Sequence, residues 1–140
     1  VRATLGAGNG GKDDKYITVK QFRHGLKKVT TEFCAGGIEG SEHESALLAA
    51  KRELEEETGY VSNDWKHIYT IPSNPTIADN YAFLYYADNC EKVSNQHLDS
   101  TEFLEVKEYT EDEINDLIKN NEFVQPIHLM GWLMVKKGVL

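Results

Sequence analysis

Short apolar and β-branched runs along the chain predict a protein built largely of strands. Six such runs are present: Val1–Leu5, Lys15–Phe22, Val29–Phe33, Trp65–Ile71, Asn80–Ala87 and Glu102–Tyr109. Runs of this composition, separated by clusters of Gly, Asn and Asp, are typical of strands. The stretch Gly6–Asp14 is rich in these turn residues and is predicted as the loop of a hairpin, and CAGGIEGSE, which follows Phe33, is predicted as a second, glycine-bearing loop.

A different spacing of apolar residues predicts a helix over Glu42–Thr58. Its apolar residues recur at intervals of three and four and are Leu47, Ala50 and Leu54. This spacing places them on one face of a helix. Ser41 and Glu44 form a capping-box pattern at the expected start. Gly59 is a stop signal of the usual kind at the expected end.

Two further helices are predicted in the last third of the chain. Thr110 and Glu113 form a second capping-box pattern, which opens a helix over Glu111–Asn120. Gln125–Lys137 is predicted as a mostly buried helix with Pro126 in its first turn, where proline is tolerated. The order of strands, helix, strands and helices predicts a mixed α/β fold with helices packed on a sheet, rather than a regular βαβ repeat. The 140 residues fit a single domain, 1–140.

Composition and charge argue against several classes of function. The net charge of −8 is unsuited to binding duplex nucleic acid, which needs a basic patch. No apolar run approaches the ~18 residues of a membrane span. The two cysteines, Cys34 and Cys90, match neither a disulfide framework nor a CxxC metal site. They fit a reducing, cytoplasmic location.

The first predicted helix carries a high density of carboxylates. Glu53, Glu56 and Glu57 stand at positions i, i+3 and i+4, so their side chains share one face. Like charges at this spacing repel, and late in a helix they also oppose the macrodipole. A hard divalent cation such as Mg²⁺ or Mn²⁺ removes both costs because it prefers carboxylate oxygens. The alternative is an acidic helix face exposed to solvent.

The segment that bears these glutamates resembles the signature of the Nudix hydrolases, G-x5-E-x7-R-E-U-x-E-E-x-G-U, where U is a bulky apolar residue. Glu44, seven intervening residues and Arg52–Tyr60 match its second part. The first part departs, because Gly36 has the required spacing from Glu42 but nine residues follow Glu42 before the arginine. Either Glu42 or Glu44 takes the place of the first glutamate, and Glu44 is alternatively only a capping residue.

The resemblance implies a Nudix fold, in which a mixed sheet is sandwiched between helices, and a bound Mg²⁺ or Mn²⁺. By position, Glu53 and Glu57 resemble the family's principal metal ligands. Glu56 resembles an additional ligand or a carboxylate that orients water. Arg52 resembles the residue that pairs with one of these glutamates and fixes its rotamer. Ala35 corresponds to a loop residue whose carbonyl binds the metal in relatives.

Residues outside the signature are similar to those of enzymes that cleave ADP-ribose and nucleotide sugars. The runs VKQFRHG and TEFCAGGIEG carry this resemblance, together with Pro75. They imply that Gly36 and Gly37 contact the substrate and that Arg23 approaches a phosphate or a signature carboxylate, with a surface ion pair as the alternative for Arg23. In the LDSTEFLEV segment, Glu102 is the candidate for a further catalytic acid. Asp99 is its alternative, and an ordinary loop acid remains open.

The resemblance therefore implies an enzyme, a Nudix pyrophosphatase. Its expected reaction hydrolyses the diphosphate linkage of ADP-ribose or a related nucleoside diphosphate sugar to a nucleoside monophosphate and a sugar phosphate. The alternatives are a Nudix hydrolase of a nucleoside triphosphate or dinucleoside polyphosphate, and a non-catalytic Nudix-like ligand-binding module. The expected partner is a small nucleotide, not a nucleic acid or a membrane. Relatives in this subgroup are often dimers, so a homodimer is a further expectation.

Other conspicuous residues carry weaker expectations. Three alternating aromatic residues point to one side of a predicted strand, either as core or with one of them stacking on a base: Tyr81, Phe83 and Tyr85. Cys34 replaces a proline that is usual in relatives and is expected to fill the core. Glu55 falls at a variable signature position and is expected in solvent. The five histidines show no ligand spacing, and no role is predicted for them.

Overall fold

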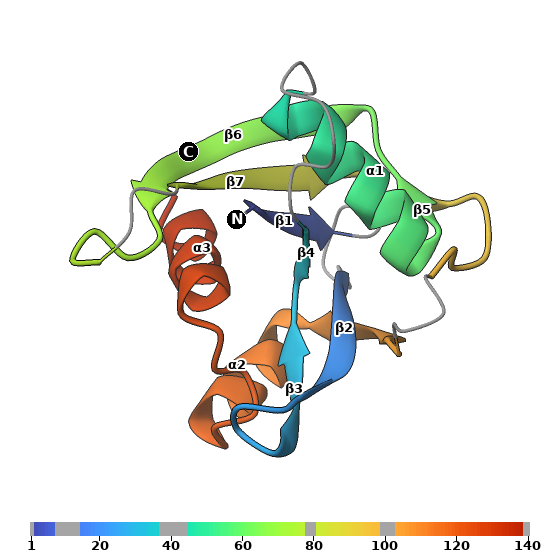
Figure 1. Cartoon of the computed structure of the whole chain (residues 1–140). Coiled ribbons are helices and arrows are strands. Elements are labelled where there is room, and N and C mark those ends of the chain that lie inside the picture. Colours follow the sequence, from blue (N-terminus) through green and yellow to red (C-terminus); the bar gives the residue numbers. More distant parts are fainter. Residues whose placement is uncertain (1, 8–14, 37–44, 78–80, 99–102, 139–140) are drawn as a thin grey trace.

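The computed structural model describes residues 2–7, 15–36, 45–77, 81–98 and 103–138, in which a sheet lies between helices (Figure 1). The strands are β1 (Arg2–Ala7), β2 (Lys15–Arg23), β3 (Lys28–Glu32), β4 (Cys34–Gly36), β5 (Tyr60–Val61), β6 (Asp64–Pro72), β7 (Tyr81–Asp88), β8 (Glu91–Lys92) and β9 (Glu105–Thr110). The helices are α1 (Ala46–Thr58), α2 (Glu111–Lys119) and α3 (Pro126–Lys136). Every predicted strand and helix is confirmed in place, with ends that differ by a few residues.

The main sheet has seven strands and is mixed. Its central path runs β3-β2-β1-β7-β6, while β4 also pairs with β1 and β9 also pairs with β2. The pairing of β1 with β7 is parallel, and the other pairings are antiparallel. The predicted hairpin between the first two strands is confirmed by the pairing of Gly6 with Ile17. A separate ribbon of β5 and β8, which the sequence did not indicate, follows the end of α1.

Helices cover both faces of this sheet, because neighbouring strand residues point to opposite sides. Tyr16 packs in a cluster with residues of α2 and α3, including Ile114 and Trp132. Its neighbour Ile17 packs in another cluster with Leu54 of α1. The predicted sandwich of a mixed sheet between helices is therefore confirmed. None of the helices in the described part of the chain is long and apolar enough to cross a membrane.

One element of the fold contradicts the sequence-based prediction. Cys34–Gly36 was expected within a loop, but it forms β4 and pairs with β1. Glycine and cysteine give no local strand signal, so this strand exists because β1 offers a free edge of backbone groups there. As a consequence of this pairing, β4 with Gly36 lies alongside α1, the helix that carries the glutamates.

The two capping signals near the end of the chain are confirmed in detail. The Thr110 hydroxyl accepts a hydrogen bond from the Glu113 N–H, and the Glu113 carboxylate accepts one from the Thr110 N–H. Pro126 occupies the first turn of α3. Apolar residues of α2 and α3 pack in one cluster with Tyr16 of β2 and Tyr109 of β9, and the opposite face of the sheet is covered by α1.

Candidate active site

Helix α1 carries the glutamate-rich segment, and both of its ends are fixed by local hydrogen bonds. It begins at Ala46 rather than at Glu42, because Ser45 has extended backbone angles and its hydroxyl accepts from the Leu48 N–H. The proposed capping pair lies in 37–44, outside the described residues. At the other end, Gly59 is confirmed as the stop, with φ of 78° and its N–H bonded to the Glu55 carbonyl.

The C-terminal end of α1 is covered by the segment that follows β8. The N–H groups of Val93 and Ser94 donate to the Gly59 carbonyl, and the His97 N–H donates to the Glu56 carbonyl. The Gln96 side chain adds a bond to the Glu57 carbonyl. These contacts satisfy carbonyls that the helix itself leaves unpaired, so the end of the helix is held firmly. They fix the backbone beneath the three signature glutamates.

The side chains of α1 are buried or exposed as their positions on the helix predict. Leu54 is buried in the core, whereas Glu55 is exposed. Glu57 is buried, with 8% of its surface exposed, and carboxylates are seldom buried in this way unless they are paired or bind a cation. Its burial distinguishes it from a glutamate on a solvated helix face.

Arg52 lies between two of the signature glutamates. Its Nη1 donates to Oε1 of Glu53 at 3.0 Å and, more weakly, to Oε2 of Glu56 at 3.4 Å. An arginine bonded to both carboxylates limits their rotamers. This geometry matches the orienting function that the resemblance implies for Arg52.

A cleft of about 870 Å³ opens beside this helix, where the end of β2, β4 and α1 meet. It brings together five of the predicted site residues: Arg23, Ala35, Gly36, Glu53 and Glu57. Glu56 and Arg52 are not part of its lining. The predicted residues Gly37 and Glu102, together with the alternatives Glu42, Glu44 and Asp99, lie outside the described residues.

Gly36 is packed directly against the carboxyl group of Glu53. A Cβ atom added to Gly36 would lie 2.2 Å from Cδ of Glu53 and 2.4 Å from its Oε1. Real Cβ atoms do not approach other atoms so closely, so only glycine allows this arrangement. Strand β4 at Gly36 is thus in close contact with Glu53, which is a candidate metal ligand.

The donor set of the cleft fits a hard divalent cation. Glu53 and Glu57 supply carboxylate oxygens, and the backbone at Ala35 is next to them in the lining. Within the described ranges, no group of three or more His, Cys, Asp or Glu side chains is arranged to hold an ion. Among the described residues, Glu53 and Glu57 would hold a cation here together with backbone or water oxygens, which suits Mg²⁺ because it keeps several waters.

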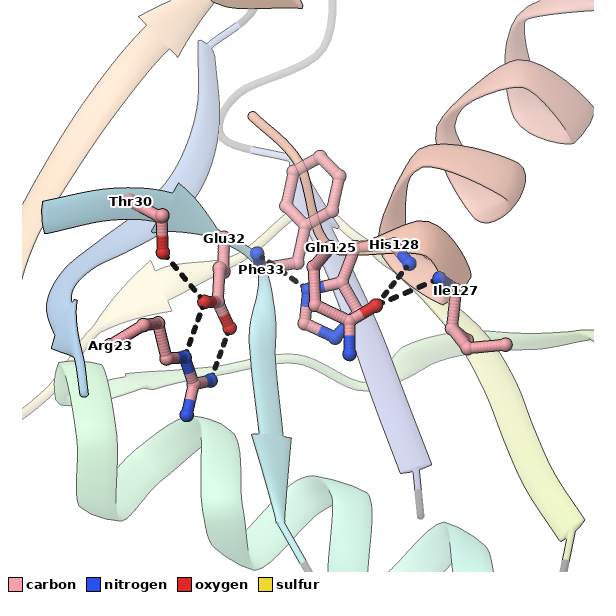
Figure 2. Close-up of polar contacts among 7 residues, drawn as sticks. All are labelled: Arg23, Thr30, Glu32, Phe33, Gln125, Ile127 and His128. Carbon is pink, nitrogen blue, oxygen red and sulfur yellow. Dashed lines mark hydrogen bonds and ion pairs between the residues drawn. The ribbon is translucent and has the colours of Figure 1, made fainter. Parts of the chain in front are cut away.

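Glu32, to which the sequence drew no attention, anchors the other wall of the cleft. Its carboxylate is 3% exposed and accepts from Arg23 through Nε at 2.7 Å and Nη2 at 2.5 Å (Figure 2). The Thr30 hydroxyl donates to the same carboxylate at 2.8 Å. Burial alone would raise the pKa of Glu32, but the bonds from Arg23 and Thr30 outweigh it and lower the pKa. The sequence shows only that Glu32 directly precedes the apolar pair Phe33 and Cys34, which does not by itself predict its burial.

His128 of α3 is buried immediately behind this pair. Its Nδ1 accepts a hydrogen bond from the Phe33 N–H at 3.1 Å, so the ring is neutral with its other nitrogen protonated (Figure 2). Burial lowers the pKa of His128 to about 4, against a smaller opposite effect of Glu32. Its ring joins α3 to the point where β3 ends and β4 begins.

Two of the residues that were singled out from the sequence, Cys34 and Tyr85, are buried in the core. Cys34 is buried, and its burial, together with the charge and hydrogen bonding of Glu57, raises the pKa of the thiol well above its usual range. It is therefore an unreactive core thiol, as expected. Tyr85 is buried and packs on Trp65 and His67, which favours core packing, whereas Tyr81 is half exposed.

The comparison with known proteins agrees with this geometry. A sequence profile described as the NUDIX domain matches residues 8–128. The chain belongs to the Nudix family. The match spans both walls of the cleft as well as α1, so it does not depend on the glutamate-rich segment alone.

Two individual proteins are similar in sequence over most of this chain. The chain is 34% identical over 131 residues to an ADP-ribose pyrophosphatase of Bacillus subtilis (strain 168), covering 91% of this chain and 69% of the relative. It is 36% identical over 108 residues to a methanol dehydrogenase activator of Bacillus methanolicus, covering 76% of this chain and 57% of that protein. The family match and the first of these relatives confirm the predicted enzyme class, a Nudix pyrophosphatase related to ADP-ribose pyrophosphatase.

A solved structure confirms the Nudix fold. The crystal structure of an ADP compounds hydrolase superposes with a TM-score of 0.81 and covers 99% of this chain and 72% of its own. At 22% sequence identity, this likeness concerns the fold alone.

Proposed function

We propose that this Nudix protein catalyses the metal-dependent hydrolysis of the diphosphate linkage in ADP-ribose or a related nucleoside diphosphate sugar. The products are a nucleoside monophosphate and a sugar phosphate. The observation that carries the proposal is the shared cleft, which is lined both by the acidic residues Glu53 and Glu57 and by Arg23. One wall suits a cation and the other suits an anion, as a metal-bound diphosphate requires.

The bound cation, Mg²⁺ or Mn²⁺, would neutralise phosphate oxygens and lower the pKa of a bound water. Glu53 and Glu57 would hold it together with the backbone at Ala35. Glu56, which is bonded to Arg52 and outside the cleft lining, would orient water or supply a further ligand. Arg52 holds Glu53 and Glu56 in place.

Arg23 is the proposed phosphate-binding residue, because it is the cation that lines the cleft among the described residues. Gly36 and Gly37 would let the substrate approach the backbone. Glu102 stays the candidate for the acid that takes a proton from water, with Asp99 as its alternative. A single Nudix domain over 1–140, a homodimer and a cytoplasmic location also stay predictions.

The test is a panel of nucleoside diphosphate sugars, nucleoside triphosphates and dinucleoside polyphosphates with Mg²⁺. Glu57→Gln keeps the size of the side chain and removes its charge, so kcat should fall at least ~100-fold. Glu55→Gln, on the exposed side of the same helix, is the matched control and should keep wild-type activity. Equal activity of Glu57→Gln and wild type would refute the metal assignment. Preference for triphosphates would refute the substrate class alone.

A further inference from the structure

The charge of Arg23 interacts with two carboxylates, that of Glu32 and that of Glu57. It is bonded through Nε and Nη2 to the buried carboxylate of Glu32. It also lines the cleft together with Glu57. The hydrogen bond to Glu32 raises the pKa of Arg23, and the charges of Glu32 and Glu57 raise it further. The guanidinium therefore has a second carboxylate nearby, and that carboxylate is the one proposed to hold the metal.

Glu32 is fixed so that it can hold the arginine in one orientation. Its carboxylate is almost fully buried and accepts a third bond from Thr30. The next residue, Phe33, is tied through its backbone N–H to the buried ring of His128 (Figure 2). Neither the side chain nor the backbone of Glu32 can therefore follow Arg23 into the cleft.

We propose that Glu32 is a positioning residue that keeps the Arg23 guanidinium on the substrate side of the cleft and away from the metal-binding carboxylate of Glu57. The inference rests on the proposed function, because it presumes the cation at Glu53 and Glu57. Glu32 touches neither substrate nor metal in this role and acts only through Arg23. The two parallel bonds set the plane of the guanidinium and leave Nη1 as the nitrogen that Glu32 does not engage.

The physical basis is competition between cations for one carboxylate. Without Glu32, the charged guanidinium would be left without its buried partner, and pairing with Glu57 would recover part of that loss. An arginine on Glu57 occupies oxygens that the metal needs and repels the metal by its charge. Glu32 thus protects the metal site and presents Arg23 to phosphate at the same time.

The experiment measures Mg²⁺ binding by calorimetry, without substrate and without turnover. Wild type is compared with Glu32→Gln, Arg23→Ala and the double variant. Glu32→Gln should bind Mg²⁺ about tenfold more weakly, the scale of one charge-assisted bond. Arg23→Ala should bind Mg²⁺ at least as tightly as wild type. The double variant should recover that affinity, because the competing cation is gone.

If Glu32→Gln weakened Mg²⁺ binding only by disturbing the structure, adding Arg23→Ala would not restore the Mg²⁺ affinity. Unchanged Mg²⁺ affinity in Glu32→Gln, or a double variant as weak as Glu32→Gln, would overturn the inference while leaving the proposed function intact. Absence of Mg²⁺ binding in wild type would overturn the proposed metal site itself. Thr30→Val removes one bond to Glu32 without touching Arg23 and should give a smaller loss in the same direction, which serves if Glu32→Gln does not fold.

Discussion

The side-chain amide of Gln96 donates to the backbone carbonyl oxygen of Glu57 at 2.8 Å, and therefore holds the last turn of α1 from outside the helix. The same nitrogen donates to the carbonyl of Leu104 at 3.0 Å. Leu104 also lines the cleft. In sequence, Gln96 and Leu104 flank the candidate acid Glu102. One side chain thus links the signature helix to both flanks of that acid.

Gln96→Ala should lower kcat about tenfold and leave KM within about threefold, because it loosens two catalytic segments without touching substrate. The melting temperature should fall as well, because two backbone carbonyls lose a hydrogen bond, and each bond contributes about 1 kcal/mol to stability. Steady-state kinetics with the best substrate of the panel measures the first effect. Asn95→Ala, at the exposed neighbouring position, is the control and should behave as wild type. Equal kcat in the two variants would contradict the linking role.

Gly36→Ala should weaken Mg²⁺ binding and lower activity while leaving the fold largely intact. The new methyl group would collide with the carboxyl end of Glu53, which is the mobile end of a side chain, so the carboxylate moves and the backbone does not. We expect a loss of at least ~10-fold in kcat, the scale seen when metal-ligand support is lost. Gly25→Ala is the matched control, because a Cβ there meets nothing within 4 Å. Normal Mg²⁺ affinity in Gly36→Ala would show that Glu53 is not a ligand.

His128 should make the protein less stable as the pH falls from about 6.5 to about 4. Burial lowers the folded-state pKa of His128 to about 4 from an ordinary 6.5. Between these pH values the unfolded chain therefore binds a proton at this ring and the folded chain does not. Above pH 6.5 the ring is neutral in both states and contributes nothing to this dependence. The full loss is about 3 kcal/mol of unfolding free energy, at 1.36 kcal/mol per pH unit.

Urea unfolding of wild type and His128→Gln across this pH range measures the effect. The variant should show a shallower loss of stability, whatever its stability at pH 7. The comparison isolates the ring from the nearby carboxylate of Glu32, which both proteins retain. His24→Gln removes an exposed histidine and should keep the wild-type slope. Parallel curves for wild type and His128→Gln would contradict the prediction.

Gln125 should contribute about 1 kcal/mol to stability as the N-cap of α3. Its Oε1 accepts from the Ile127 N–H at 2.7 Å and from the His128 N–H at 3.3 Å (Figure 2). Gln125→Ala leaves both donors without this partner, whereas Gln125→Asn offers a shorter side chain that can still cap. Thermal unfolding should rank wild type first, the asparagine variant second and the alanine variant last. An alanine variant as stable as wild type would rule out the cap.

Elements with local signals could be predicted from the sequence, and those that depend on distant partners could not. Helix α2 was predicted to its first residue, because Thr110 and Glu113 cap it within one turn. Strand β4 was missed, because it exists only through its pairing with β1. The start of α1 was placed too early, because the spacing of Ser41 and Glu44 suggested a capping box, whereas the helix is capped by Ser45, which has no glutamate three residues on.

The same distinction holds within the site. Glu53 and Glu57 could be found because helical spacing puts them on one face, and the structure places both in the cleft. Glu32 and His128 could not, because their burial depends on contacts across the fold, such as the Phe33–His128 bond between residues 95 apart. Arg23 was recognised as a site residue, but its bond to Glu32 was not, because the two residues are not direct partners in the β2–β3 register.

The position of β1 has a consequence for the order in which the protein acquires its structure. This strand lies between β2 and β7, and its residue Arg2 pairs with Phe83 in parallel. Parallel pairing at such sequence separation closes a long loop and is slow. On the ribosome, the glutamate helix and the arginine strand are therefore synthesised well before the sheet that unites them can close. We therefore expect the cleft to be completed late in folding, after β7 has paired with β1.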